Sequence, residues 1–244
     1  HKFEGLYRGN LHTHNVIFNT YLHISKNFIS LVESLKNAPG QVPSFKGSLE
    51  DVKTCLPRIM GGKEKKDAIF GKLHKSAAAL SGSKVVVLNP ELNSRLPLRC
   101  WPKENYEKLI RKLLVIPDIF VIAVCVDYTK SSFNISSERY IDLIGKTTIK
   151  ELVDLFSISD LFISHDSGAV HLASLTDVNI ISIFGPETPI LYHSLSEKKE
   201  VIYLNLACSP CFSPYNYRKS LCKDNRCLKL ITVEEVFNRA VKYL

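Results

Sequence analysis

From residue 84 onward, short apolar segments alternate with longer segments whose apolar residues recur at helical spacing. This alternation constrains the fold more than any other feature of the sequence. The apolar segments look like strands and lie at residues 85–88, 119–126, 140–143, 161–164, 180–184 and 201–204. Strands that alternate with helices are typical of a parallel sheet covered on both faces. We therefore predict an α/β fold, a Rossmann-like doubly wound parallel sheet.

Helix starts in this part of the chain are marked by capping sequences. Residues 148–151 (TIKE) and 232–235 (TVEE) each place a Glu three residues after a Thr. In a capping box the Thr side chain accepts a hydrogen bond from the backbone of the third residue, and the Glu reaches back to the Thr backbone. We therefore expect helices from 149 and 233. In the first helix the residues facing the core would be Ile149, Leu152, Val153 and Phe156.

Residues 1–80 have a different pattern. An apolar stripe at helical spacing runs from Tyr21 to Leu35, and residues 39–66 are rich in Gly, Pro and Lys without a sustained period, as expected of a linker. The chain begins at His1 without an initiator Met, so we expect it to be a fragment. The sequence thus divides into a helical and irregular segment at 1–80 and an α/β domain at 81–244.

The balance of charge favours an anionic partner. Lys and Arg number 32 against 24 Asp and Glu, a net charge of +8, which suits nucleic acid, an anionic membrane face or phosphorylated ligands. The basic residues are scattered, with no aromatic-rich basic patch, so we expect no nucleic-acid binding. No apolar run approaches the roughly 20 residues that a membrane-spanning helix needs.

The most informative segment is residues 161–173, where an apolar strand runs directly into a Gly-containing turn and a helix. A helix start attracts anions because its unpaired backbone N–H groups and its dipole point at the ligand. Gly168 permits the close approach of a phosphate, Ser167 can cap the helix and donate a hydrogen bond, and His171 can donate from the first turn. Asp166 can orient His171 or the loop amides. The alternative is a plain N-cap beside a buried structural histidine.

A second turn of the same kind follows along the chain. The strand at 180–184 ends in Gly185-Pro186 and is followed by Glu187 and Thr188. Two strand ends side by side, each with a Gly turn, predict a crevice at the carboxyl edge of the parallel sheet.

The loop after the first strand, residues 89–102, is expected to form the other wall of this crevice. It carries Ser94, Arg95 and Arg99. An arginine fork binds phosphate oxygens bidentately, and hydroxyls supply further donors. The alternative is a long loop with solvent-facing arginines.

Four of the seven cysteines lie close together in the sequence. Cys208 and Cys211 form a CxxC pair, and Cys222 and Cys227 follow. This set is suited to tetrahedral zinc. Paired disulfides or free thiols are the alternatives, and disulfides are disfavoured in a reducing cytosol. Whether they bind zinc or form disulfides, these cysteines would cross-link the loop at 208–227.

In this order, these segments resemble glycosyltransferase family 9, the ADP-heptose:lipopolysaccharide heptosyltransferases. The resemblance covers residues 84–244, and residues 1–36 resemble more loosely the end of the family's N-terminal domain. The matching text is Asn-Pro at 89–90 through Trp-Pro at 101–102, IGKTT at 144–148, DSG at 166–168 with His171, FGPETP at 184–189, and CSPC at 208–211 through Cys227.

The resemblance implies a GT-B fold, in which two Rossmann-like domains face each other across a cleft. Residues 81–244 would be the C-terminal domain, which holds the sugar nucleotide. Residues 1–80 would be the tail of the N-terminal acceptor domain plus a linker. The family's base, an aspartate, lies in the N-terminal domain, so the catalytic residue of this chain is unknown.

By position, the resemblance also assigns binding residues. The segment after the strand at 119–126 is shorter than in the family, which leaves Asp127 as the candidate for the ribose. The residues expected at the donor and its phosphates are Ser94, Arg95, Arg99, Asp166, Ser167, Gly168, His171, Glu187 and Thr188.

The implied function is transfer of a heptose-like sugar from an ADP-sugar to a lipopolysaccharide-type glycolipid by the intact enzyme. Cationic side chains would stabilise the departing diphosphate. No cofactor is required for this catalysis, and the metal expected is a structural zinc at the cysteines. A basic surface suits a cytoplasmic enzyme held peripherally at the anionic inner face of the bacterial inner membrane. The alternative is a catalytically inactive nucleotide-binding or scaffold module.

Overall fold

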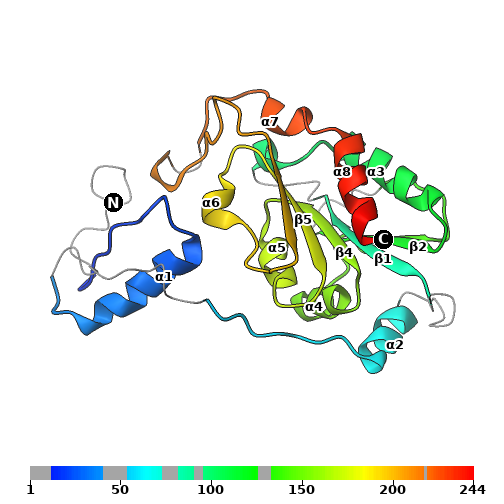
Figure 1. Cartoon of the computed structure of the whole chain (residues 1–244), viewed down its shortest axis with the longest axis horizontal. Coiled ribbons are helices and arrows are strands. Elements are labelled where there is room, and N and C mark those ends of the chain that lie inside the picture. The colour runs from blue at the N-terminus through cyan, green and yellow to red at the C-terminus, as the bar shows by residue number, and fades with distance from the viewer. Residues whose placement is uncertain (1–11, 41–53, 73–81, 91–95, 126–132, 217–218) are drawn as a thin grey trace.

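A computed structural model of the chain describes residues 12–40, 54–72, 82–90, 96–125, 133–216 and 219–244 (Figure 1). Its strands form one six-stranded sheet in the order β3-β2-β1-β4-β5-β6, and every neighbouring pair is parallel. This is the strand order of a dinucleotide-binding Rossmann sheet. The predicted fold class is therefore confirmed. The strands are β1 (Lys84–Asn89), β2 (Ile119–Ala123), β3 (Tyr140–Asp142), β4 (Leu161–His165), β5 (Asn179–Phe184) and β6 (Lys199–Tyr203).

Helices cover both faces of this sheet, as Figure 1 shows. On one face lie α3 (Lys103–Val115) and α8 (Val233–Ala240), and on the other lie α4 (Ile149–Ser157) and α5 (Gly168–Ala173). Successive residues of β1 alternate between the two cores: Val86 packs with the first layer and Val87 with the second. Burial on both faces explains why the strands read as continuous apolar runs rather than as alternating ones.

The capping sequence at 148–151 forms as predicted. Thr148 Oγ1 accepts from Glu151 N (3.3 Å), and Glu151 Oε2 accepts from Thr148 N (2.8 Å). The prediction that Ile149 faces the core is wrong, because this residue is 70% exposed, whereas Leu155 is buried. The first residue of α4 lies on the solvent side of the helix, and the buried face begins only one turn later.

The N-terminal segment contains two helices, α1 (Ile24–Glu33) and α2 (Lys63–Lys72). The predicted irregular stretch at 39–66 therefore ends inside a helix. Residues 54–72 pack along the sheet domain: Ile59 N donates to Leu175 O (2.7 Å), and α2 contacts α4. By contrast, α1 lies apart from the sheet (Figure 1).

The remaining elements are short connections, and the described residues contain no helix long and apolar enough to span a bilayer. The short helices are α6 (Pro189–Tyr192), α7 (Arg226–Lys229) and the 3-10 turns η1 (Ser34–Lys36), η3 (Pro97–Arg99), η4 (Pro214–Asn216) and η5 (Val241–Tyr243).

Candidate functional site

The predicted crevice lies where the strand order reverses: β2 and β3 lie on one side of β1, and β4 to β6 lie on the other. Strands β1 and β4 are neighbours, and Asn89 at the end of β1 pairs in register with Ser164 of β4. Helices leave these two strands toward opposite faces, so their carboxyl ends form the topological switch point at which ligands bind in open α/β sheets. The turn at 166–168 follows directly after β4.

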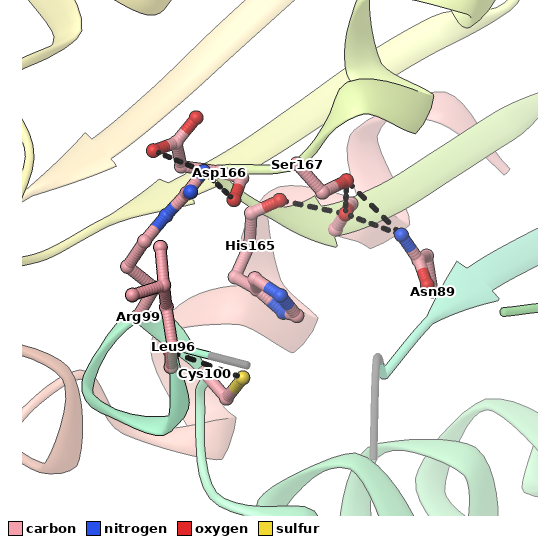
Figure 2. A network of polar contacts seen from close by, with 8 residues as sticks. Asn89, Leu96, Arg99, Cys100, His165, Asp166 and Ser167 are labelled. Atoms are coloured by element: carbon pink, nitrogen blue, oxygen red, sulfur yellow. Dashed lines mark hydrogen bonds and ion pairs between the residues drawn. The ribbon is translucent and has the colours of Figure 1, made fainter. Parts of the chain in front are cut away.

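Arg99 joins the two predicted walls of the crevice. Its Nη2 donates to Asp166 Oδ2 (2.9 Å) and to Asp166 O (2.7 Å), as Figure 2 shows. The side chains are 19% and 7% exposed, so this is a buried ion pair. Arg99 Nε is also buried and has no hydrogen-bond partner among the described residues. The structure thus brings Arg99 and the turn together, as predicted, and within the described residues the Nε–H of the guanidinium lacks an acceptor.

The loop that carries Arg99 is fixed from the C-terminal part of the chain. Asn225 Nδ2 donates to Leu98 O (3.2 Å) and to Cys100 O (3.1 Å), on either side of the arginine. Trp101 Nε1 donates to Ile231 O (3.0 Å) from within the core. These bonds hold the arginine against the end of β4 before any ligand arrives.

The charged groups around the turn influence one another. Burial raises the pKa of Asp166 above its ordinary value, and the nearby Arg99, His165 and His171 oppose that rise. Burial lowers the pKa of His171, and the Asp166 carboxylate opposes that change. A lowered pKa keeps His171 neutral near pH 7, where one ring nitrogen can donate a hydrogen bond. The predicted proximity of Asp166 and His171 is therefore present.

Ser167 has different partners from those expected. It stands at the N-cap position of α5 but makes no capping hydrogen bond with its side chain. Its Oγ accepts instead from Asn89 Nδ2 (3.0 Å) and contacts Ser164 Oγ (3.0 Å). The capping role is wrong because the hydroxyl is turned into a buried polar network below the turn (Figure 2).

A cavity of about 310 Å³ opens beside this turn. Its size matches the lower range of small-molecule sites. The sequence assigned no role to Asn89, Cys125 and Thr147, although each lies at or just beyond a strand end, which was the one available signal. The lining residues are Asn89, Val124, Cys125, Thr147, Thr148, Ile149, Leu152, Ser167, Gly168, Ala169 and Leu172.

Tyr106 is another residue whose contribution was not predicted. Its hydroxyl accepts from His165 N (3.1 Å) and contacts His165 Nδ1 (3.2 Å), and both residues are fully buried. Helix α3 therefore fixes the end of β4 immediately before Asp166. The helical spacing of Tyr106 with Leu109 and Leu113 indicates a buried helix face, but it does not indicate a contact with β4.

The second Gly turn serves mainly to dock the cysteine-bearing loop. Pro186 O accepts from Cys211 N (2.9 Å) and from Phe212 N (2.8 Å), and Gly185 O accepts from the Ser209 hydroxyl. Glu187 is 1% exposed, and Thr188 Oγ1 accepts from Ile190 N (3.3 Å) at the start of α6. A role of Glu187 and Thr188 at the donor stays a prediction.

Three predicted site residues, Ser94, Arg95 and Asp127, lie outside the described residues.

The four clustered cysteines line one cavity of about 550 Å³, and no disulfide joins them in the structure. Burial, together with smaller effects of the neighbouring Cys211, Cys208 and Cys222, raises the pKa of Cys227 to about 11. Within the described part of the chain, no three His, Cys, Asp or Glu side chains are placed to hold one metal ion. The four cysteines therefore share one cavity, and the predicted zinc site or disulfides stay predictions.

Gly168 provides a test of the site that should not disturb the fold. A Cβ built on Gly168 meets no atom of the described residues within 4 Å, and the residue begins α5. Gly168→Ala should therefore change the free energy of unfolding by less than about 1 kcal/mol. A ligand held against this backbone would meet the added methyl. ADP should therefore bind severalfold more weakly, measured by calorimetry alongside thermal unfolding. Unchanged ADP affinity would show that no ligand approaches this residue.

The fold and the site together define a Rossmann-like α/β domain with an arginine and a Gly-containing turn at its switch point. The model of glycosyltransferase family 9 (heptosyltransferase) matches residues 60–221 of this chain. That match spans more than half of the chain, so the protein belongs to glycosyltransferase family 9, and the predicted family is confirmed.

Individual relatives agree with this assignment. The chain is 29% identical over 172 residues to lipooligosaccharide heptosyltransferase 2 of Campylobacter jejuni subsp. jejuni serotype O:2, covering 67% of this chain and 52% of the relative. The structure of E. coli ADP-heptose LPS heptosyltransferase II is similar in fold, with a TM-score of 0.66 and 17% identity over 93% of this chain and 64% of that one.

The heptosyltransferase TibC in complex with ADP-D-beta-D-heptose, described as iron-containing and dodecameric, is similar with a TM-score of 0.50 and 18% identity, covering 66% of this chain and 45% of that one. The chain spans about half the length of the curated relatives first matched.

Proposed function

We propose that this chain is the donor-binding part of a family 9 heptosyltransferase. It would hold an ADP-sugar whose sugar the intact enzyme transfers to a lipooligosaccharide or lipopolysaccharide acceptor. The observation that carries the proposal is the buried Arg99 Nε beside the turn at 166–168, a donor without a partner among the described residues. A diphosphate oxygen is a suitable acceptor for such a donor. The ADP-heptose complex of TibC supports the choice of nucleotide.

In this arrangement the groups around the turn at 166–168 have different roles in binding the nucleotide. Arg99 and the neutral His171 would donate to the diphosphate, while Asp166 holds the guanidinium in place. The cavity of about 310 Å³ beside Gly168 would take the nucleoside. As the sugar–phosphate bond breaks, negative charge grows on the departing ADP, and fixed donors stabilise that charge without reorganising. The protein's own side chains supply this stabilisation, and no cofactor is part of the proposal.

The same proposal includes the predicted division of the chain. Residues 1–80 would form the tail of an N-terminal acceptor domain and the linker that follows it, and the catalytic base would lie in that domain. The face of α1 supports this, because Phe28, Leu31 and Val32 are half or more exposed although all three are large and apolar. A row of such side chains on one helix favours contact with another folded surface.

A transfer assay separates this function from the alternative of an inactive nucleotide-binding module. The chain would be given ADP-heptose and a heptose-deficient lipooligosaccharide, alone and together with the N-terminal half of a family 9 relative. We expect ADP release only when both halves are present. Donor binding without release in either mixture would favour the inactive module.

For the cysteine loop we propose a structural zinc, supported by the four thiols that line one cavity. Among the described residues, no three of these sulfurs are close enough to bind one ion, so zinc binding would require the loop at 208–227 to contract around the metal. Metal analysis after purification under reducing conditions should find about one zinc per chain, lost in Cys227→Ser. Without metal, seven titratable thiols per denatured chain would favour free cysteines, and three would favour two disulfides within the cluster.

We also propose a cytoplasmic location, at the inner face of the bacterial inner membrane. The net charge of +8 supports attraction to anionic lipids. Sedimentation with vesicles that contain phosphatidylglycerol should carry the chain down at low salt, and vesicles of neutral lipid should not. Equal recovery with both kinds of vesicle would contradict peripheral binding.

A further inference from the structure

The end of strand β1 carries a buried polar side chain that lies outside the predicted site. Asn89 is 5% exposed, lines the cavity of about 310 Å³, and lies across from Ser164 in the sheet register. Its Nδ2 donates to Ser167 Oγ (3.0 Å) and to Ser164 Oγ (3.3 Å), as Figure 2 shows. Its Oδ1 has no partner among the described residues. Asn89 is therefore the donor on which both serine hydroxyls depend.

The hydroxyl protons of this network can be assigned one by one. Ser164 Oγ donates to His165 O (2.7 Å), which uses its only proton. The contact between the two serine hydroxyls (3.0 Å) must then be made with the proton of Ser167. If that proton turned toward a ligand, each serine oxygen would still accept from an N–H of Asn89. The network can therefore release the Ser167 proton without leaving a buried hydroxyl oxygen unsatisfied.

We propose that Asn89 is a positioning residue, which keeps the Ser167 hydroxyl proton available to an oxygen of the donor diphosphate. This rests on the proposed function, because it needs an anion at the turn. The amide group is required because its N–H donors replace the bond that Ser167 gives up. A side chain that only accepts would do the opposite, since it would take the Ser167 proton for itself.

Asn89→Asp tests this directly because it keeps the size of the side chain and exchanges a donor for an acceptor. Binding of ADP and of adenosine to the whole chain would be measured by calorimetry. A hydrogen bond to a charged group contributes roughly tenfold or more in affinity, so ADP should bind at least about tenfold more weakly to Asn89→Asp. Adenosine affinity should change by less than about twofold, since it carries no diphosphate.

A double-mutant cycle distinguishes positioning from a general disturbance of the site. Ser167→Ala should weaken ADP binding to a similar extent, and Asn89→Asp should then cost much less in that background than in the wild-type chain. Additive losses, or equal losses for ADP and adenosine, would overturn the proposal. No loss in Asn89→Asp, while the wild-type chain binds ADP, would also overturn it and leave the donor site standing.

Ser164→Ala provides a second variant should Asn89→Asp fail to fold. It removes the hydroxyl that takes the Ser167 proton in the free protein, so ADP should bind about two- to threefold more tightly. Weaker or unchanged ADP binding by Ser164→Ala would overturn the role of the network. Absence of ADP binding by the wild-type chain would overturn the proposed function itself, and the positioning role with it.

Discussion

Replacing Arg99 with alanine should lower the free energy of unfolding by about 3 kcal/mol or more and remove ADP binding. The guanidinium is the ion-pair partner of a carboxylate that is only 7% exposed, and breaking a buried pair from one side leaves an uncompensated charge, at a cost of roughly 3–5 kcal/mol. The same substitution removes the Nε donor, which has no partner in the described part of the chain and which the proposed site offers to the diphosphate. Denaturant unfolding and calorimetry would measure the two effects separately.

Two variants control this prediction. Arg99→Lys keeps a positive charge beside Asp166 but lacks the guanidinium fork, so we expect most of the stability to remain while ADP affinity falls. Arg111→Ala removes an exposed arginine paired with Glu107, and it should change the free energy of unfolding by at most about 1 kcal/mol. If Arg99→Ala proved no more destabilising than Arg111→Ala, the buried ion pair would have no role in the fold.

The stability of Arg99→Ala should also depend on pH in a defined direction. Burial already raises the pKa of Asp166, and loss of the arginine raises it further. Between the unfolded and the raised folded pKa, the native chain binds more protons than the unfolded chain, so stability increases as pH falls. The difference in the free energy of unfolding between variant and wild type should therefore narrow as the pH falls below neutrality. If the difference in the free energy of unfolding did not change with pH, the uncompensated charge of Asp166 would not be the cause of the lost stability.

Gly185→Ala should destabilise the chain by about 2 kcal/mol, through a steric effect rather than through the ligand. A Cβ at residue 185 would lie 2.5 Å from Leu228 Cγ, and Leu228 is completely buried, so neighbouring backbone or side chains would have to shift. Overpacking of this kind costs roughly 1–3 kcal/mol. Thermal and denaturant unfolding would measure the loss.

The cause of that loss can be isolated with a second substitution. Leu228→Ala removes the atoms that the new methyl would meet, so the double variant should be more stable than the sum of the two single losses predicts. Gly168→Ala is the matched control, because in the described part of the chain the new Cβ would meet no atom within 4 Å. Strict additivity at 185 and 228 would show that the glycine is required for some other reason.

The predictable parts of the fold are those determined by residues that lie close together in the sequence. Strands buried on both faces produce continuous apolar runs, and the capping box at 148–151 depends on residues three apart. The meeting of Arg99 with the turn at 166–168 was also predictable, because the carboxyl ends of parallel strands share one edge.

What escaped prediction depends on contacts between distant segments. The partners of Ser167 are set by the register of β1 against β4, so the hydroxyl serves Asn89 and Ser164 rather than the start of its own helix. The tight packing of Gly185 against Leu228 joins residues 43 positions apart, which no local period records. The exposure of Ile149 reflects where α4 first touches the sheet.

The central claim is that the switch point between β1 and β4 binds the nucleotide of an ADP-sugar. Calorimetric titration of the whole chain with ADP, repeated with Arg99→Lys, tests it most directly. We predict saturable binding of one ADP per chain, with affinity at least about tenfold lower in Arg99→Lys, because the loss of a charge-assisted bond has about that effect. Absence of heat at millimolar ADP, or equal binding by the two proteins, would contradict it.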